Sequence, residues 1–417
     1  MLGISRSNFP KDKQVLAKDL ISGVTVAIVA LPLAIGFGIT SGIGAAAGIS
    51  TAIIGGFIAS LFGGSRFQVS GPTGAMTVVL IPVVNKFGIG AIPALGVIAG
   101  FIVIMLSVMK LGSLINKVPN AVVEGFTVGI AVIISLQQLP FALGVTKGEG
   151  ERTLVIAYNT IKSALKIGIH WQTLLVVAIT LIIKFNIVKV VEFFKLRMYF
   201  PASFVALFLT TLITKIFDLN VASISDIPRN VSVFTSPFLA SGSYLPLIMP
   251  AVSIALLVAI ESLLSARVAD DISNVPPSEK FKPNQELLGQ GLATSVASIF
   301  GGMPATGAIA RTNVNVRAGA STRASAMFHS VVLLIIVLFL APIFSQIPSA
   351  AIAGVLIGTS FRIFNKATMN EIFVSSKSNI FIYFITALVS VSIDLIWGIC
   401  FGIALYLTIG LFKKSNS

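Results

Sequence analysis

The feature that most constrains this chain is a series of long apolar runs that recurs from Asp19 to Phe412. A helix of about 20 apolar residues crosses the hydrocarbon core of a bilayer, which is about 30 Å thick. Hydrophobic residues make up 55% of the sequence and charged residues only 11%, unlike the composition of a soluble domain. We therefore expect an all-helical, polytopic membrane protein whose main solvent is the lipid bilayer.

Apolar runs separated by polar loops predict about fourteen transmembrane segments, several of them short or interrupted by Gly and Pro. An even number of spans places both termini on one side of the membrane. The stretches 145–170 and 218–243 are polar enough to be extramembrane connections. The expected segments are residues 19–41, 46–63, 72–84, 89–112, 120–143, 171–188, 199–217, 244–270, 284–301, 307–318, 323–344, 347–362, 378–393 and 395–412.

The Lys and Arg residues test this count, because they collect in cytoplasmic loops. Of the 29 Lys and Arg residues, 21 fall in loops on the side of the N-terminus, 7 fall on the opposite side, and Arg311 lies inside a segment. We therefore expect a protein of the cell membrane with both termini in the cytoplasm. Residues 1–18 would form a cytoplasmic segment, residues 19–412 the transporter domain, and residues 413–417 a cytoplasmic tail.

Composition argues against several other classes of protein. The net charge of +14 is spread over short loops without a basic domain, so we expect no nucleic-acid partner. A single Cys400 and two histidines far apart argue against a bound metal ion. The sequence shows no nucleophile–base pair and no nucleotide-binding motif. We therefore expect neither an enzyme nor a cofactor.

A weak internal repeat links the two halves of the chain. Phe-Gly-Gly at 62–64 is followed by Thr-Gly-Ala-Met at 73–76, and Phe-Gly-Gly at 300–302 by Thr-Gly-Ala-Ile at 306–309. These pairs precede the third and tenth segments, which match in a scheme of seven plus seven spans. Because seven is odd, the two halves would be inverted repeats. Paired short, interrupted segments point to a transport site near the membrane midplane, although a chance match of helix-end glycines is the alternative.

Each copy of this repeat predicts a short extended strand followed by a half-helix that begins inside the membrane. Such a helix start exposes free N–H groups and the positive end of the helix dipole. Two starts that face each other make an anion site without a metal ion. The alternative is that the small residues only permit close helix packing. The candidate anion-binding residues of the two breaks are Thr73, Gly74, Thr306, Gly307 and Ala308.

Two further residues are candidates for the anion site. Arg311 follows the second break by one helical turn in an apolar stretch, where a cation is costly unless it faces a cavity or an opposite charge. We expect it to attract the anion, the alternative being a side chain that reaches the cytoplasmic interface. Phe37, on the first helix, could close one wall of the site, although packing against lipid or other helices explains it nearly as well.

Glu261 is the candidate for cation coupling. It lies inside the apolar run 246–264, and an ionisable side chain within a membrane segment is a functional candidate by default. Ser262 and Ser265 add hydroxyl groups, with Ser265 one turn further on the same helix face. The carboxylate could carry a proton or help to bind sodium. Its alternative role is that of a structural partner for Arg311.

Three stretches resemble the sulfate permease (SulP) family of anion transporters. They are GGSRFQVSGPTG at 63–74, NQELLGQG at 284–291 and GGMPATGAIART at 301–312. The resemblance implies fourteen helices in two inverted repeats, with a core domain (about 19–112 and 244–344) that carries the anion past a gate domain (about 120–217 and 347–412) in an elevator-like movement. It also implies that Phe37, Thr73, Ala308 and Arg311 lie at the anion, and that Glu261 and Ser265 match positions used for cation coupling.

Family members usually carry a cytoplasmic STAS domain after the last helix, whereas this sequence stops at residue 417. That domain is either naturally absent or missing from this sequence. We expect a secondary active transporter of a small inorganic anion, sulfate first, coupled to protons, which could assemble as a homodimer. The alternatives are a sodium-dependent bicarbonate transporter, a nucleobase permease and a passive anion channel. The permease would require acidic groups at both breaks, and the second break offers Arg311 instead.

Overall fold

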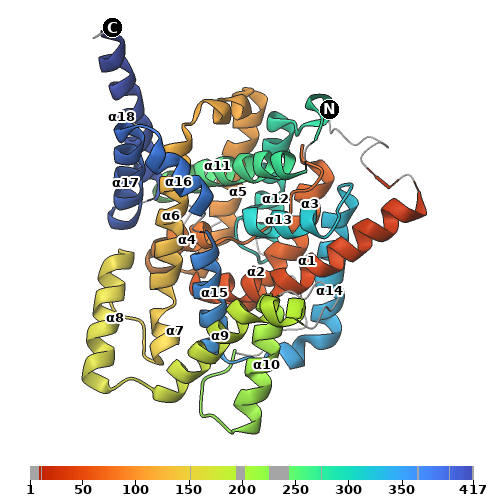
Figure 1. Ribbon diagram of the computed structural model, residues 1–417, viewed down its shortest axis with the longest axis vertical. Coiled ribbons are helices and arrows are strands. Elements are labelled where there is room, and N and C mark those ends of the chain that lie inside the picture. Colours follow the sequence, from red (N-terminus) through yellow and green to blue (C-terminus); the bar gives the residue numbers. More distant parts are fainter. Residues whose placement is uncertain are drawn as a thin grey trace. The chain divides into compact units, whose positions relative to one another are not determined.

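A computed structural model describes residues 9–10, 12–150, 152–193, 202–224, 244–273, 275–363, 366–393 and 395–415. Residues 1–8 and 11 of the predicted N-terminal segment and residues 416–417 of the predicted tail lie outside this part of the chain. Within it, regular structure is almost entirely helical (Figure 1). Helices satisfy their own backbone hydrogen bonds, which is the requirement for a chain that crosses lipid.

The chain divides into two compact units. The first unit comprises Met1–Ile115, Ile183–Ile216 and Ser223–Pro348, and the second comprises Asn116–Ile182, Phe217–Ala222 and Ser349–Ser417. The expected division into a core domain and a gate domain concerns how the two parts move, which the division into compact units does not test, so it stays a prediction.

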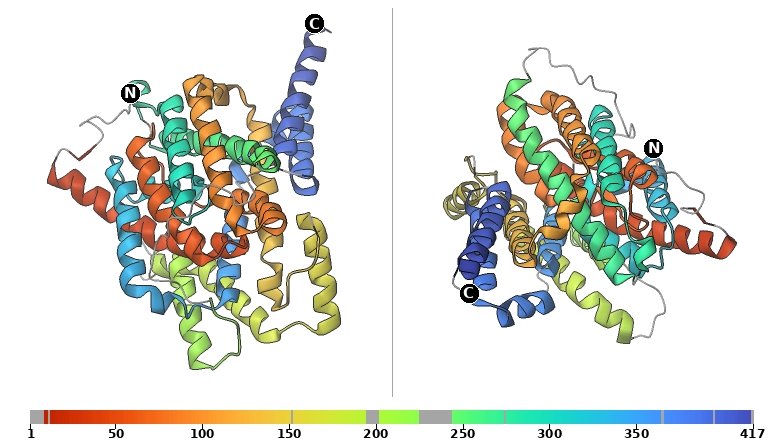
Figure 2. Two further views of the ribbon diagram at one scale, coloured as in Figure 1. Left: turned by 180° about the vertical axis from the view of Figure 1, so that it is seen from behind. Right: turned by 90° about the horizontal axis from the view of Figure 1, so that it is seen from above.

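The helices of the first unit include those expected around both breaks. In this unit α1 and α14 pack along each other (Figures 1 and 2). A π-helical stretch, Thr51–Gly55, separates α2 from α3. The helices are α1 (Lys13–Thr40), α2 (Ala45–Ser50), α3 (Gly56–Phe62), α4 (Gly74–Phe87), α5 (Ile92–Val108), α10 (Ala202–Ile216), α11 (Ile248–Ile272), α12 (Pro283–Ile299), α13 (Ile309–Arg317) and α14 (Ala324–Phe344).

The second unit is also built of helices, and α9 (Trp171–Phe193) runs from this unit into the first. In the second unit α17 packs against both α6 and α18. The helices are α6 (Asn120–Gln137), α7 (Leu139–Leu143), α8 (Thr153–Ile167), α15 (Ser349–Ile363), α16 (Lys366–Val374), α17 (Lys377–Ser392) and α18 (Leu395–Ser415).

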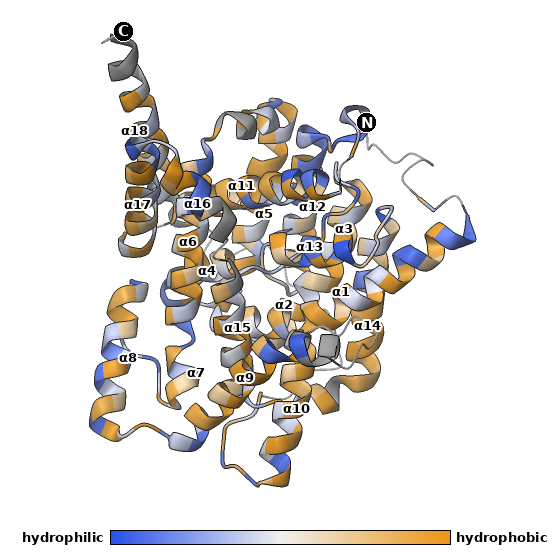
Figure 3. Ribbon diagram, in the orientation of Figure 1, coloured by the Kyte–Doolittle hydropathy of each residue, from blue (hydrophilic) through white to orange (hydrophobic). Residues whose placement is uncertain are grey.

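Length and composition identify the helices that can cross a bilayer. Among the described residues, five stretches qualify: Lys13–Thr40, Ala45–Phe62, Ile89–Val108, Asn120–Leu143 and Leu245–Ile272. Shorter apolar helices accompany them, and the hydropathy colouring shows how apolar most of these helices are (Figure 3). The chain is therefore a multi-pass membrane protein. The expected number of about fourteen spans and the inverted repeats stay predictions.

The structure differs from expectation in two connections: α16 lies between the expected segments 347–362 and 378–393, and α8 lies within 145–170. The stretch 145–170 was expected to be a simple loop, but it contains α8. The buried face of α8 consists of the small residues Ala157, Thr160 and Ala164, while Tyr158 and Leu165 are exposed. A hydropathy scan does not detect a helix whose buried positions carry so little apolar surface. The other expected connection, 218–243, lies largely outside the described residues.

Close packing of α5 on α12 supports the first unit. A Cβ atom on Gly100 would lie 2.1 Å from Ser295 Oγ and 2.5 Å from the backbone oxygen of Gly291. A Cβ atom on Gly96 would lie 1.9 Å from Ser298 Oγ. Because lipid tails are as apolar as side chains, small residues that let backbones approach are a main source of helix association in membranes.

Gly100→Leu should therefore destabilise the protein, because a side chain at this position must push α5 and α12 apart. Overpacking of this kind costs about 1–3 kcal/mol. The measurement is the thermal unfolding midpoint of the purified protein in detergent. Gly90→Ala is the control, since a Cβ atom there meets nothing within 4 Å. Equal midpoints for the wild type and both variants would contradict the packing argument.

Candidate functional site

A two-stranded ribbon joins the two breaks within the first unit. Strands β1 (Ser70–Gly71) and β2 (Thr306–Gly307) pair in antiparallel fashion, with Ser70 opposite Gly307 and Gly71 opposite Thr306. Helix α4 begins three residues after β1, and α13 begins directly after Ala308. Because paired antiparallel strands run in opposite directions, the two helices leave the ribbon at opposite ends.

Both helices present uncapped N-termini at this ribbon. Thr73 and Ala308 are the N-cap residues of α4 and α13; both have extended backbones, and neither side chain makes a capping hydrogen bond. The first N–H groups of a helix have no partner within the helix, and they carry the positive end of its dipole. All five residues that the sequence assigns to the two breaks lie in this short region, and all are buried. They are Thr73, Gly74, Thr306, Gly307 and Ala308.

Helix α11 contacts the ribbon through successive polar residues. Thr73 donates a hydrogen bond from Oγ1 to Glu261 Oε2 at 2.9 Å. The backbone N–H of Gly307 donates to Ser262 Oγ at 2.9 Å, and Ser262 Oγ shares a hydrogen bond of 3.0 Å with Thr306 Oγ1. Glu261 therefore lies against the start of α4, while Ser262 holds β2.

Ser265, one turn further along α11, contacts α13. Its hydroxyl donates to Thr312 Oγ1 at 3.0 Å, and the same oxygen accepts from the backbone N–H of Val69 at 3.1 Å. Thr312 thus links α11, α13 and the start of β1. Thr312 is not among the residues predicted for the site, although its place directly after Arg311 in the motif 301–312 is a usable signal.

Arg311 crosses from α13 to the first break. Its side chain is only 1% exposed, and Nη2 donates to the backbone oxygen of Pro72 at 2.7 Å. Within the described part of the chain, Nε and Nη1 have no hydrogen-bond partner, and no carboxylate lies within ion-pairing distance. Gly71 lets the guanidinium lie directly against the strand, since a Cβ atom there would lie 2.1 Å from Nη1. The alternative pairing of Arg311 with Glu261 is therefore not observed.

Phe37 is buried on α1, a helix that packs against both α4 and α13. Its place as a wall of the anion site stays a prediction.

Besides Glu261, the acidic group that the sequence predicts for the site, the first unit buries the side chains of Asp19, Asp270 and Glu286. Asp19 on α1 accepts hydrogen bonds from the backbone N–H groups of Ser321 and Thr322, at 2.7 and 3.1 Å. Glu286 on α12 binds backbone N–H groups before β1. Asp19 therefore holds the loop between α13 and α14, and Glu286 holds the turn that precedes β1.

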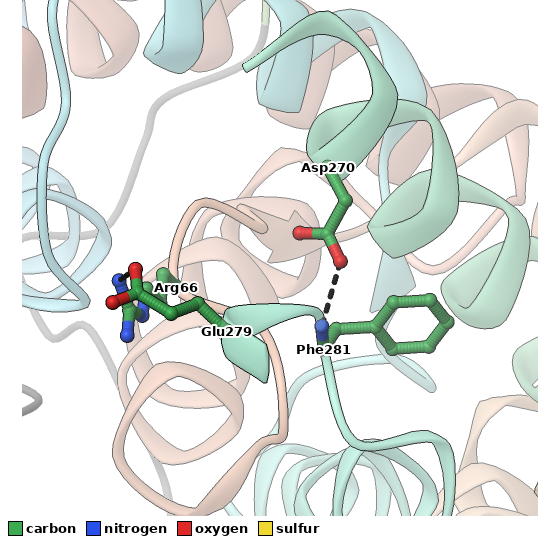
Figure 4. A network of polar contacts seen from close by, with 4 residues as sticks. All are labelled: Arg66, Asp270, Glu279 and Phe281. Atoms are coloured by element: carbon green, nitrogen blue, oxygen red, sulfur yellow. Dashed lines mark hydrogen bonds and ion pairs between the residues drawn. The ribbon is translucent and has the colours of Figure 1, made fainter. Parts of the chain in front are cut away.

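The connection between α11 and α12 is fixed by two polar contacts, drawn in Figure 4. Asp270 Oδ2 accepts from the backbone N–H of Phe281 at 2.6 Å, and Arg66 pairs with Glu279 at 2.7 Å. The ion pair is partly exposed to solvent, where such pairs contribute only about 0–1 kcal/mol.

This arrangement can bind an anion and a small cation at neighbouring positions. Helix N-termini, the hydroxyl of Thr73 and the unpaired charge of Arg311 favour an anion, whereas Glu261 and the hydroxyls of α11 can receive a proton or a sodium ion. Within the described residues, no group of three or more His, Cys, Asp or Glu side chains could hold a metal ion.

The sequence matches one family over most of its length. Residues 16–386 match the model described as "Sulfate permease family". The chain is 34% identical over 410 residues to YvdB of Bacillus subtilis, a proposed sulfate transporter, covering 97% of this chain and 75% of that protein. It is 31% identical over 414 residues to the bicarbonate transporter BicA of Picosynechococcus, covering 95% of this chain and 70% of BicA.

Solved structures show the same fold. The transmembrane domain of a cyanobacterial bicarbonate transporter BicA superposes with a TM-score of 0.80 at 28% identity, covering 93% of this chain and 98% of that domain. The murine Slc26a9 anion transporter in its inward-facing state gives a TM-score of 0.82 at 16% identity, covering 97% of this chain and 70% of that protein. At this low identity the second match shows the fold alone.

Ala308→Leu should abolish anion binding, because a large side chain at the N-cap of α13 would fill the space beside the helix start. Sulfate binding to the purified variant, followed by calorimetry, measures this loss. Ala308→Gly keeps the space open and is the control. If the leucine variant binds sulfate as well as the wild type does, the anion site lies elsewhere.

Proposed function

Because this chain belongs to the sulfate permease family, whose members are membrane anion transporters and not enzymes, we propose that it takes up sulfate together with protons. The transporter works by an elevator-like movement of a core against a gate, in a fold of about fourteen spans and two inverted repeats. It lies in the cell membrane with both termini in the cytoplasm, as the distribution of Lys and Arg indicates.

One observation carries the anion part of this proposal. Two helix N-termini meet at the ribbon, and the buried Arg311 lies beside them without an ion-pair partner in the described part of the chain. A buried, unpaired cation is unfavourable in a low-dielectric surrounding, and a bound anion would relieve that cost. Oxyanions such as sulfate also accept several hydrogen bonds, which the free N–H groups of α4 and α13 can donate.

The position of Glu261 supports proton coupling. Its carboxylate accepts a hydrogen bond from Thr73, the residue at which α4 begins. An ionised Glu261 would repel an anion bound at this helix start by on the order of a few kcal/mol. Protonation removes that repulsion, so the proton and the anion favour each other's binding, as a symporter requires.

A sodium-dependent bicarbonate transporter is the second candidate. The similarity to BicA, named a bicarbonate transporter, favours this alternative. Glu261 together with Ser265 would then be the candidate sodium site. A passive anion channel could use the same helix ends and arginine, but it could not accumulate its ion beyond the electrochemical limit.

Uptake of labelled sulfate into liposomes should be accelerated by an inward proton gradient, and sulfate should accumulate beyond the electrochemical limit of a passive channel. The wild-type rate should fall as the external pH rises, because fewer carriers are loaded with a proton. Glu261→Gln should still bind sulfate yet lose the acceleration, since a neutral amide mimics a protonated carboxyl group. Parallel assays with bicarbonate, chloride and succinate under a sodium gradient serve as comparisons. Sodium-driven bicarbonate uptake that ignores pH would replace this proposal with the second candidate.

Arg311→Ala should weaken sulfate binding at least tenfold, which corresponds to about 1.4 kcal/mol. The reason is the loss of a favourable charge in a buried site. Arg317→Ala is the matched control, because Arg317 lies on the same helix but is exposed. Near-normal affinity of a folded Arg311→Ala variant would refute the role of this charge.

A further inference from the structure

Helix α12 carries a polar stripe that none of the roles assigned above explains. Glu286, Gln290 and Thr294 are spaced four residues apart, which places them on one face of the helix. All three are at most 1% exposed. Buried polar groups in lipid are costly unless they are hydrogen-bonded, so the partners of this stripe matter.

Glu286 binds the turn that precedes β1. Its Oε2 atom accepts hydrogen bonds from the backbone N–H groups of Gly64 and Ser65, at 2.7 and 2.8 Å. Gly289 lets α12 approach this turn, since a Cβ atom there would lie 2.5 Å from the backbone of Gly63. The carboxylate therefore fixes the chain six residues before the first strand begins.

Gln290 connects this carboxylate to the ribbon. Its Nε2 atom donates to Glu286 Oε1 at 2.8 Å and to Ser70 Oγ at 2.6 Å. Ser70 is the first residue of β1 and pairs with Gly307. A single side-chain amide thus ties a buried carboxylate to the strand pair.

Thr294 reaches the second break. Its hydroxyl donates to the backbone oxygen of Ala305 at 2.9 Å, one residue before β2 begins. Over two helical turns the stripe therefore contacts the chain before β1, within β1 and before β2. The two breaks come from opposite halves of the sequence, and α12 holds both.

We propose that the polar stripe of α12 positions the anion site, with Gln290 as its central positioning residue. The inference rests on the proposed function, because the site is the pair of helix starts at the ribbon. Charge and N–H groups stabilise an anion only when they are held close to the required geometry. By fixing Ser70 and Ala305, the stripe sets the register in which α4 and α13 face the anion, without touching the anion itself.

Two measurements on Gln290→Leu test this role. Hydrogen–deuterium exchange of the peptides covering 66–76 and 303–310 should speed up at least about tenfold, because the ribbon opens more readily. The sulfate dissociation constant should rise about tenfold, as expected for the loss of one charge-linked hydrogen bond. Ser298→Ala is the matched control, since Ser298 lies one turn further on the same face and its hydroxyl has no partner within the described residues.

Ser70→Ala separates positioning from general stability. If Gln290 acts through Ser70, adding Gln290→Leu to Ser70→Ala should change the dissociation constant less than about threefold further, because the contact is already lost. Independent, multiplicative effects of the two variants would overturn the proposal. So would faster exchange with unchanged sulfate affinity, which would make the stripe merely structural.

One further variant and one further measurement complete the test. Gln290→Asn shortens the side chain by one methylene and replaces the leucine variant if that protein does not fold; unchanged exchange and affinity would overturn the proposal. A wild-type protein that binds neither sulfate nor bicarbonate would refute the proposed substrate class. The exchange data would then still decide whether Gln290 holds the ribbon, because they need no bound anion.

Discussion

The structure depends on one constraint, which is that backbone N–H and C=O groups inside a lipid bilayer must find partners within the protein. A continuous helix meets this requirement alone, but a helix that begins in the middle of the membrane leaves its preceding residues unpaired. Here strands β1 and β2 pair with each other, and further backbone groups in and beside them are hydrogen-bonded by Ser262, Thr312 and Thr294. Glycines at 71 and 307 allow the side chains of Arg311 and Gln68 to lie directly against the ribbon. The unwound stretches are therefore stabilised by side chains from three helices, α11, α12 and α13.

The same arrangement determines where charge is placed. Arg311 is held by a single backbone carbonyl and not by a carboxylate, so its positive charge remains available to a ligand. Glu261 is likewise held by a hydroxyl and not by a cation. Had these two side chains formed an ion pair, the site would be neutral and its desolvation cost already offset. In the proposed function, keeping the opposite charges apart on α11 and α13 lets Arg311 respond to the anion and Glu261 to the proton.

The residues of the two breaks could be predicted from the sequence, but the side chains that hydrogen-bond the ribbon could not. Two matching Gly-rich motifs and an arginine in an apolar stretch were enough to place Thr73, Ala308 and Arg311 in one region, because such patterns are rare inside membrane segments. Glu286 and Gln290 were not predicted as site residues, although both lie in the motif 284–291. They lie near the polar start of α12, where hydropathy gives no reason to expect burial. Their four-residue spacing with Thr294 was visible, yet the partners of a polar stripe depend on tertiary contacts. Helix α8 was missed for the related reason that small residues, rather than large apolar ones, form its buried face.

The pairing of Ser70 with Gly307 also has a consequence for how the protein is inserted into the membrane during synthesis. Segments enter the membrane in the order of synthesis, so the first break is inserted long before its partner strand, Gln290 or Thr312 exists. Until then its strand lacks the partners that lipid cannot supply, and closing so long a loop is slow. The candidate site can therefore be completed only after the second half of the chain has entered the membrane.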